Sequence, residues 1–244
     1  MSGNIVIEVL FPEISGVFGD QANMRYLKCC LPQAEFVRTA LTEEPYFAKN
    51  VPSLIYLGAM TEKKQELAIK KLMPYKKRLK ELIAAGVPML FTSNAVEILG
   101  KGILTEDGKI RALGLYDFFA KRQMMNRINS LLRGHFGNIE IVGFKTQFTK
   151  AYEYKNSNLF REKLFIKTDK GMGMNCEGGP EGFRDRNLFA TYLVGPFLIL
   201  NPDFTLYLMR DVMKIKDAEL AFEDEIRLAY KRRVDEFYDP KTEY

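Results

Sequence analysis

Histidine is the scarcest functional residue of this chain, since its 244 residues contain only one, His135. A histidine-rich zinc site cannot be built from one imidazole, and a Ser-His or Cys-His hydrolase is possible only if His135 is itself the base. The three cysteines, Cys29, Cys30 and Cys176, are odd in number and show no CxxC spacing. They predict reduced thiols in a cytosolic protein rather than a disulfide framework. We expect no metal site and no cofactor.

Long apolar runs are also missing. No stretch approaches the roughly 18 uninterrupted apolar residues of a membrane span, and residues 1–12 lack the basic region and cleavage site of a signal peptide. The composition, 47% hydrophobic and 27% charged, is that of an ordinary globular protein. We therefore expect a cytoplasmic protein with one domain over residues 1–244 and no membrane partner. The net charge of +5 is mild and makes nucleic acid an unlikely partner.

Strands alternate with helices in the first hundred residues. Residues 4–11, 36–38, 53–57 and 88–91 have the β-branched and apolar patterns of strands. Helical patterns occupy residues 22–30, with Asp20 as N-cap, residues 61–85, with a break at Pro74 and a stop at Gly86, and residues 95–99. This alternation predicts an α/β fold whose parallel sheet carries helices on both faces.

The second half of the chain has a different texture. Residues 139–144, 147–154, 164–167 and 188–192 have the patterns of strands joined by turns, and the glycine-dense residues 171–182 are expected to form a loop. Two helical patterns, residues 204–213 and 218–237, end the chain.

Two loops stand where an open α/β sheet binds its ligands, at the carboxyl ends of strands. Ser93 lies on a sharp strand-to-helix turn, which can expose a nucleophile and direct backbone N–H groups at a developing oxyanion. Gly58 and Ala59 follow a strand of their own and could supply a second N–H.

Several short motifs, taken in order, resemble the class I glutamine amidotransferases, and in particular the cobyric acid synthase-like branch that includes the amidotransferase subunit of lipid II isoglutaminyl synthase. The motifs are Phe18-Gly19-Asp20 with Asn23-Met24, Leu57-Gly58, residues 90–100 (LFTSNAVEILG), Gly114-Leu115, Arg127, Gly143-Phe144, Glu181-Gly182, Asn187, residues 191–196 (TYLVGP) and Asn201-Pro202. The resemblance implies a three-layer, flavodoxin-like, mostly parallel sheet and an activity in which glutamine is hydrolysed and its ammonia transferred.

The residues that carry the chemistry of that family are different here. Its nucleophilic cysteine falls on Ser93, its histidine on Val194, and the two glycines after the cysteine on Asn94 and Ala95. The family's Gly-Gly-Gln-Asp oxyanion loop is represented by residues 59–62 (AMTE). Valine transfers no proton, and a serine hydroxyl is a weak nucleophile without a base. The resemblance therefore implies a protein that has lost glutaminase activity.

Other residues offer weaker replacements for that chemistry. His135, Cys176 or an unassisted Ser93 could take over, although a surface histidine and an inert thiol are the simpler interpretations. Cys29 and Cys30 are expected to fill the core. Arg127 could hold a ligand carboxylate with its planar guanidinium, and a structural ion pair is the alternative.

Three functions remain open at this point. The first is a non-catalytic amidotransferase-like protein, which would bind a small ligand through Gly58, Ala59, Asn94 and Arg127 or serve, as the resemblance implies, as the partner subunit of a separate, Mur-ligase-like ATP-dependent ligase. The second is an active amidotransferase with rebuilt catalytic residues that supplies ammonia to such a ligase. The third is a basic interaction module that uses the lysine-rich segment from Lys63 to Lys80, whose simpler interpretation is a solvated helix face.

Overall fold

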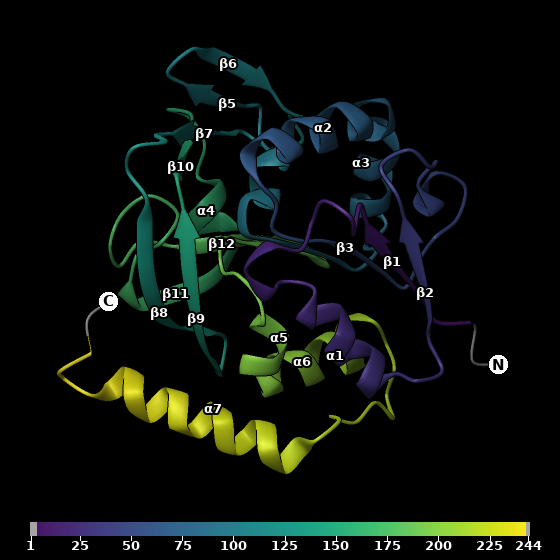
Figure 1. Cartoon of the computed structure of the whole chain (residues 1–244), viewed down its shortest axis with the longest axis vertical. Helices are drawn as coiled ribbons and strands as arrows, with labels where there is room; N and C mark the ends of the chain where they lie inside the picture. Colours follow the sequence, from purple (N-terminus) through teal and green to yellow (C-terminus); the bar gives the residue numbers. More distant parts are fainter. Residues whose placement is uncertain (1–3, 243–244) are drawn as a thin grey trace.

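A central nine-stranded sheet organises the molecule, which we describe over residues 4–242 of a computed structural model. Its parallel half contains β1 (Val6–Leu10), β2 (Glu35–Thr39), β3 (Leu54–Leu57), β4 (Met89–Thr92) and β13 (Leu188–Thr191). These strands lie in the order β2-β1-β3-β4-β13 (Figure 1). This is the flavodoxin-like order, so the predicted fold class is confirmed.

The other half of the sheet is antiparallel. It continues through β12 (Glu181–Asp185), β11 (Leu164–Gly171), β8 (Ile128–Phe136) and β9 (Ile139–Gln147). A second sheet has the order β10-β7-β5-β6, formed by β10 (Thr149–Glu153), β7 (Phe118–Arg122), β5 (Gly102–Thr105) and β6 (Gly108–Arg111). The sequence patterns predicted neither the four strands from β5 to β8 nor β12, and the loop predicted at residues 171–182 is shorter, because Gly171 ends β11 and Glu181 begins β12. β6, for example, is a four-residue strand (GKIR) with one partly buried apolar side chain, so its pairing with β5 rather than its own pattern specifies it.

Helices cover both faces of the parallel half (Figure 1). On one side lie α1 (Ala22–Cys30), α5 (Phe197–Leu200) and α6 (Pro202–Tyr207), and on the other lie α2 (Glu62–Leu72) and α3 (Lys76–Ala84). The break predicted at Pro74 is confirmed, because a 3-10 turn over Met73–Tyr75 separates α2 from α3.

The remaining helices differ more from their patterns. The helix predicted at residues 95–99 is a 3-10 helix over Ser93–Leu99, and the pattern at residues 204–213 divides into α6 and a π-helical turn, Leu208–Val212. The last helix, α7 (Glu223–Tyr238), begins five residues later than its pattern, since Phe222 has a left-handed φ of 53°. A short helix, α4 (Leu159–Glu162), precedes β11.

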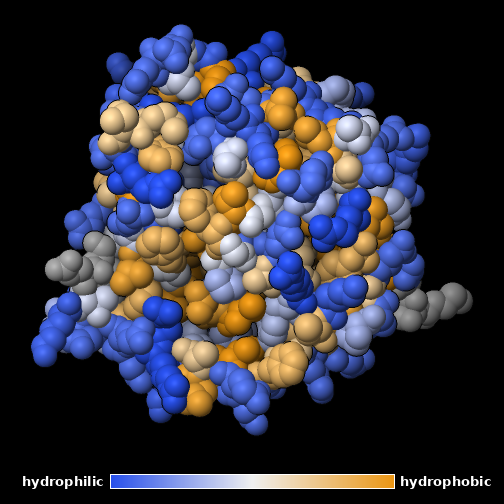
Figure 2. All heavy atoms as spheres, viewed as in Figure 1, coloured by the Kyte–Doolittle hydropathy of each residue, from blue (hydrophilic) through white to orange (hydrophobic). Residues whose placement is uncertain are grey.

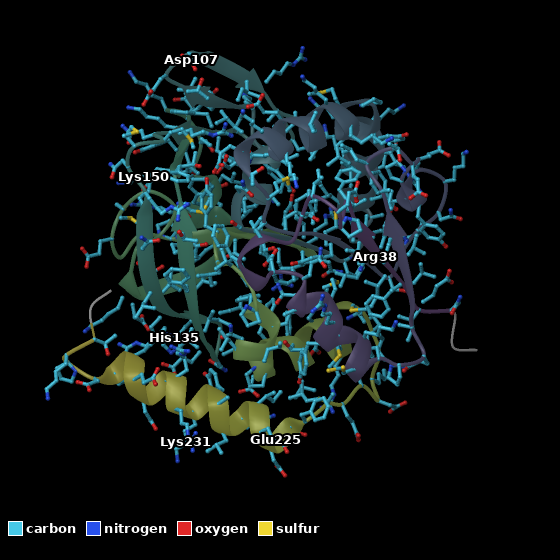
Figure 3. The ribbon with its side chains drawn as sticks, viewed as in Figure 1. Arg38, Asp107, His135, Lys150, Glu225 and Lys231 are labelled. Atoms are coloured by element: carbon cyan, nitrogen blue, oxygen red, sulfur yellow. The ribbon has the colours of Figure 1, made fainter. Side chains whose placement is uncertain are left out.

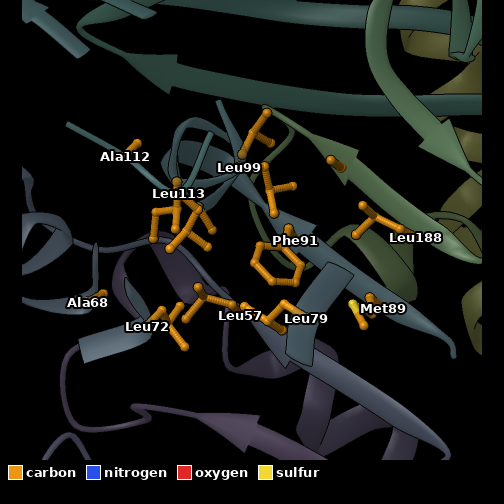
Figure 4. Packing of buried hydrophobic residues seen from close by; sticks show 14 of the residues in the cluster. Leu57, Ala68, Leu72, Leu79, Met89, Phe91, Leu99, Ala112, Leu113 and Leu188 are labelled. Atoms are coloured by element: carbon orange, nitrogen blue, oxygen red, sulfur yellow. The ribbon is translucent and has the colours of Figure 1, made fainter. Parts of the chain in front are cut away.

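The core has two parts, one on each face of the sheet. Alternate residues of a strand point to opposite faces. Leu57 and Phe91 therefore pack with α2 and α3 (Figure 4), whereas their neighbours Tyr56 and Leu90 pack with α1, α5 and α6. Among residues 4–242, no helix is long and apolar enough to span a bilayer.

Candidate functional site

Ser93 lies directly after β4, at the carboxyl end of the parallel strands. Its φ of 54° is in the left-handed region, which a residue other than glycine adopts only under strain. The residue is 3% exposed. This is the backbone geometry of a nucleophile elbow, at the position where the resemblance predicts one.

Val194 reaches the same turn from the end of β13. The Ser93 N–H donates to the Leu193 carbonyl at 3.2 Å, and the Val194 N–H donates to the Phe144 carbonyl at 2.9 Å. Val194 is buried, with 4% exposure. Within residues 4–242, no side chain hydrogen-bonds to the Ser93 hydroxyl, and Glu62 is the one carboxylate among the residues that line the same pocket.

The one imidazole and the three thiols lie elsewhere. His135, on β8, contacts Asp169 with its Nδ1 2.6 Å from Oδ2, on the side of the sheet near α7 (Figure 3). Cys176 is exposed in the loop between β11 and β12. Cys30 is half-buried, but Cys29 is exposed on α1, so the prediction that both fill the core is wrong for Cys29. None of these four residues lines the pocket at Ser93.

The backbone N–H groups of the loop that the resemblance assigns as the oxyanion loop are hydrogen-bonded within the protein. The Ala59 N–H donates to Asp20 Oδ2 at 2.7 Å. The Met60 N–H donates to Asn94 Oδ1 at 3.1 Å, and Asn94 returns a hydrogen bond from Nδ2 to the Met60 carbonyl at 2.7 Å. A glycine at position 94, as in the family pattern, could make neither side-chain bond. Asn94 therefore closes the loop onto the elbow.

The space that remains beside Ser93 is small. The pocket holds about 20 Å³ and is lined by Phe18, Met60, Glu62, Ser93, Asn94, Arg127, Thr146, Gln147, Phe148 and Thr149. Ligand pockets usually hold roughly 300–1,000 Å³, whereas a space of this size suits about one water molecule. Arg127 is exposed at the edge, with its guanidinium 4.6 Å from the centre of the Phe148 ring and no ion pair within the described chain. The structure thus brings Ser93, Asn94 and Arg127 together in one pocket, whereas Gly58 and Ala59 are buried and do not line it.

Asp20 connects the loops of the site and is the residue whose role the sequence patterns missed. It makes no N-cap bond to α1, whose N-cap position is Gln21, so that prediction is wrong. Its Oδ2 instead accepts hydrogen bonds from the Tyr56 hydroxyl at 2.7 Å and the Thr92 hydroxyl at 2.6 Å, in addition to the Ala59 N–H. Burial raises the pKa of Asp20 above its ordinary value, and these donors oppose the shift.

Close packing around Asp20 explains why two positions of the motifs are glycine. A Cβ at Gly58 would lie 2.4 Å from Asp20 Oδ2, and a Cβ at Gly195 would lie 2.3 Å from Asp20 Cα. The motifs that contain Asp20, Gly58, Thr92 and Gly195 are therefore parts of one contact set around a single buried carboxylate.

A buried ion pair lies beside the site. Lys145 directly follows the Gly143-Phe144 motif, and its ammonium pairs with Glu181 and donates to the Gly173 carbonyl at 2.9 Å. Both side chains are fully buried. Burial lowers the pKa of Lys145, and Glu181 opposes this shift. Glu181 also accepts hydrogen bonds from the Thr191 hydroxyl and the Tyr192 N–H, so the pair anchors the end of β13.

Glu97 forms a second buried polar group, one turn after Ser93. Its Oε2 accepts a hydrogen bond from Gln65 at 2.9 Å, while its Oε1 has no hydrogen-bond partner within the described chain. Burial raises the pKa of Glu97. Gln65 also accepts a hydrogen bond from Arg122 at 2.5 Å. Among residues 4–242, no cluster of histidine, cysteine and carboxylate side chains could hold a metal ion.

Comparison with known proteins shows which sequences this chain is similar to. Residues 13–202 match the model of the CobB/CobQ-like glutamine amidotransferase domain. Over 167 residues the chain is 32% identical to the lipid II isoglutaminyl synthase (glutamine-hydrolyzing) subunit GatD of Staphylococcus aureus (strain N315), and the match covers 67% of this chain and 65% of that protein.

Solved structures share the fold. One glutamine amidotransferase superposes with a TM-score of 0.52 at 13% identity, over 85% of this chain and 98% of the other. A glutamine amidotransferase from Thermotoga maritima superposes with a TM-score of 0.50 at 11% identity, over 96% of this chain and 92% of the other. Since the family model covers most of the chain, this protein belongs to the CobB/CobQ-like glutamine amidotransferase family.

Proposed function

We propose that this chain is a non-catalytic member of its family that acts as a partner subunit. The observation that carries the proposal is the elbow itself, where within residues 4–242 no side chain hydrogen-bonds to the Ser93 hydroxyl and Asn94 occupies the Met60 N–H. Loss of acid–base help typically costs about 10²–10⁴-fold in rate. Loss of one oxyanion donor costs about 10²–10³-fold more. Together these losses remove useful glutamine hydrolysis.

The pocket supports a role in binding a protein rather than a small ligand. With about 20 Å³ available beside Ser93, a molecule the size of glutamine does not fit unless Asn94 releases the oxyanion loop. The matched relative is a subunit of a synthase by name. We therefore propose a separate, Mur-ligase-like ATP-dependent ligase as the partner.

We also propose that residues 1–244 form one domain. The late strand β13 lies between β4 and β12 in the same sheet, which supports a single folded unit.

A glutaminase assay with staged variants tests the loss of catalysis. We expect no ammonia release from glutamine by the wild-type chain. We also expect none from the double variant Ser93→Cys/Val194→His, because the Met60 N–H stays bonded to Asn94. Adding Asn94→Gly should free this donor, enlarge the pocket and give measurable ammonia release. Labelling of the introduced thiol in the two variants by a glutamine-analogue electrophile reports access to the pocket separately.

The competing interpretation is an active amidotransferase with rebuilt residues. Ammonia release by the wild-type chain, alone or with its partner, that is lost in Ser93→Ala would establish that interpretation and contradict ours.

The partner is tested separately by affinity purification of the tagged full chain from its native cells. We expect an ATP-dependent ligase to co-purify, and recovery of this chain alone would contradict the subunit role.

A further inference from the structure

A second cavity, lined by basic side chains, lies between the start of α3 and the hairpin formed by β5 and β6. It holds about 490 Å³ and is lined by Lys76, Lys101, Lys109, Arg111 and residues 112–114. We call it the basic cleft. Among the described residues that line it, none is acidic, and none also lines the Ser93 pocket. The cleft is therefore separate from the site of the proposed function.

The strand geometry directs two of the cations to one side. Lys109 and Arg111 are two residues apart on β6, so their side chains leave the same face of that strand. Ile110, between them, points the other way and packs against the core. Pairing of β6 with β5 fixes this register, with Arg111 opposite Gly102.

Two glycines leave room for lysine side chains to lie close to the backbone. A Cβ at Gly102 would lie 3.0 Å from Lys109 Cε, so the stem of this lysine lies across the glycine. A Cβ at Gly114 would lie 3.6 Å from Lys76 Nζ, which places that ammonium against the backbone of the cleft. Gly114 has a φ of 61°, which glycine adopts without strain.

Most of this positive charge is uncompensated. Lys101 forms an ion pair with Asp117 and lies 4.9 Å from the centre of the Tyr154 ring. Lys76, Lys109 and Arg111 make no ion pair with any residue from 4 to 242. Lys109 also borders a neighbouring cavity whose lining includes the carboxylates of Glu62, Glu66, Glu106 and Asp107. Asp107 lies at the tip of the hairpin (Figure 3). Like charges gathered in one cleft repel each other, so an anion bound among them would be stabilised by all of them.

We propose that the basic cleft binds a phosphate chain, such as a diphosphate or triphosphate group. Lysine ammonium groups bind phosphate oxygens as point charges, and an arginine guanidinium binds two oxygens at once. Cations from α3, from β6 and from the segment before β5 suit several linked phosphates better than a single carboxylate. No aromatic ring lines the cleft, and Lys101 covers the nearby Tyr154 ring, so nothing there would stack on a nucleobase. Mostly hydrophilic residues cover this end of the molecule (Figure 2).

Isothermal titration calorimetry of the full chain with tripolyphosphate tests the proposal. We expect saturable binding at one site that weakens as salt is added. Lys109→Gln with Arg111→Gln should weaken binding by about tenfold or more, since two charge-assisted contacts are lost. The matched control, Lys64→Gln with Lys70→Gln, removes the same charge from exposed positions on α2 outside the cleft and should change the affinity by less than about twofold.

The source of the phosphate chain is tested in the same experiment. We expect ATP and GTP to bind about as tightly as tripolyphosphate, and inorganic phosphate more weakly. Absence of saturable binding, or an equal loss in the cleft and control variants, would overturn the proposal. So would nucleotides that bind about tenfold or more tightly than tripolyphosphate, because the ligand would then be recognised through its nucleoside. Matching far-UV circular dichroism and melting temperatures must show that the variants remain folded.

Discussion

Replacement of Asp20 should destabilise this protein more than replacement of any exposed carboxylate. Its Oδ2 accepts hydrogen bonds from Tyr56, Ala59 and Thr92, and its Oδ1 accepts one from Asn23 at 3.1 Å. In Asp20→Ala the Ala59 N–H loses its acceptor, while the Tyr56 hydroxyl can turn to the Asp20 backbone carbonyl at 3.0 Å and the Thr92 hydroxyl to the Tyr56 oxygen at 3.3 Å. An unsatisfied buried donor costs about 1–3 kcal/mol, and the two weakened bonds and the lost side-chain packing add to it, so we expect a loss of about 2–4 kcal/mol. That is a large part of the roughly 5–15 kcal/mol that a folded protein typically has.

Asp20→Asn gives a graded test of the same contact set. The amide oxygen can still face the three donors, but the new NH2 group then faces Asn23 Nδ2. Asn23 cannot rotate its amide freely, because its Oδ1 accepts the Leu198 N–H at 2.9 Å. We therefore expect a cost of about 1–3 kcal/mol from one unsatisfied or repelling pair. Tyr56→Phe, which removes a single donor, should cost about 1–2 kcal/mol.

Urea unfolding measures these losses. The chain contains no tryptophan and 12 tyrosines, so far-UV circular dichroism and tyrosine fluorescence are the probes, and their transitions must coincide. Asp217→Asn, at an exposed position, is the matched control and should change the unfolding free energy by less than about 0.5 kcal/mol. A double-mutant cycle of Asp20→Asn with Tyr56→Phe should show clear coupling. The reasoning is refuted if Asp20→Ala costs no more than Asp217→Asn, or if the cycle is additive.

Three further predictions concern the buried groups around the site. Lys145→Met should lower the free energy of unfolding by about 3–5 kcal/mol, because it leaves Glu181 buried without its cation. Adding Glu181→Gln should recover part of that loss in the same urea-unfolding assay. Gly195→Ala should destabilise the protein more than Gly137→Ala, since a Cβ meets the Asp20 backbone at 2.3 Å at the first position, whereas at the second it meets open space and only the backbone strain of a φ of 57°; equal losses would contradict the packing account. Burial raises the pKa of Glu97 above its ordinary 4.5, so the folded state binds this proton more tightly than the unfolded state. That contribution to stability is present below pH 4.5 and is lost as the pH rises through the folded pKa. Glu97→Gln should therefore gain in unfolding free energy relative to wild type as the pH rises from about 4 to about 8, and a pH-independent difference would argue against it.

Much of the parallel half could be predicted because its pattern is local. β1, β3 and β4 are short apolar runs, α2 and α3 have helical spacing, and Pro74 interrupts that spacing at the observed break. The antiparallel half of the central sheet and the second sheet were harder to predict. Strands such as β6 carry exposed charges and exist because a partner strand supplies their hydrogen bonds, which no local pattern reports.

The elbow at Ser93 and the substituted positions Asn94 and Val194 were evident from the order of the motifs. The sequence alone determined which side chains stand at these positions, and its resemblance to the family predicts that a proton-transferring residue is missing at Val194. Only the tertiary structure decided the state of the oxyanion loop, because the bond from the Met60 N–H to Asn94 joins residues 34 positions apart. In the same way, the sequence pattern predicts Asp20 as a helix cap, whereas in the folded protein its carboxylate accepts hydrogen bonds from Tyr56, Ala59 and Thr92. A carboxylate's partners are set by which strand ends meet in space, and the chain's linear order does not contain that information.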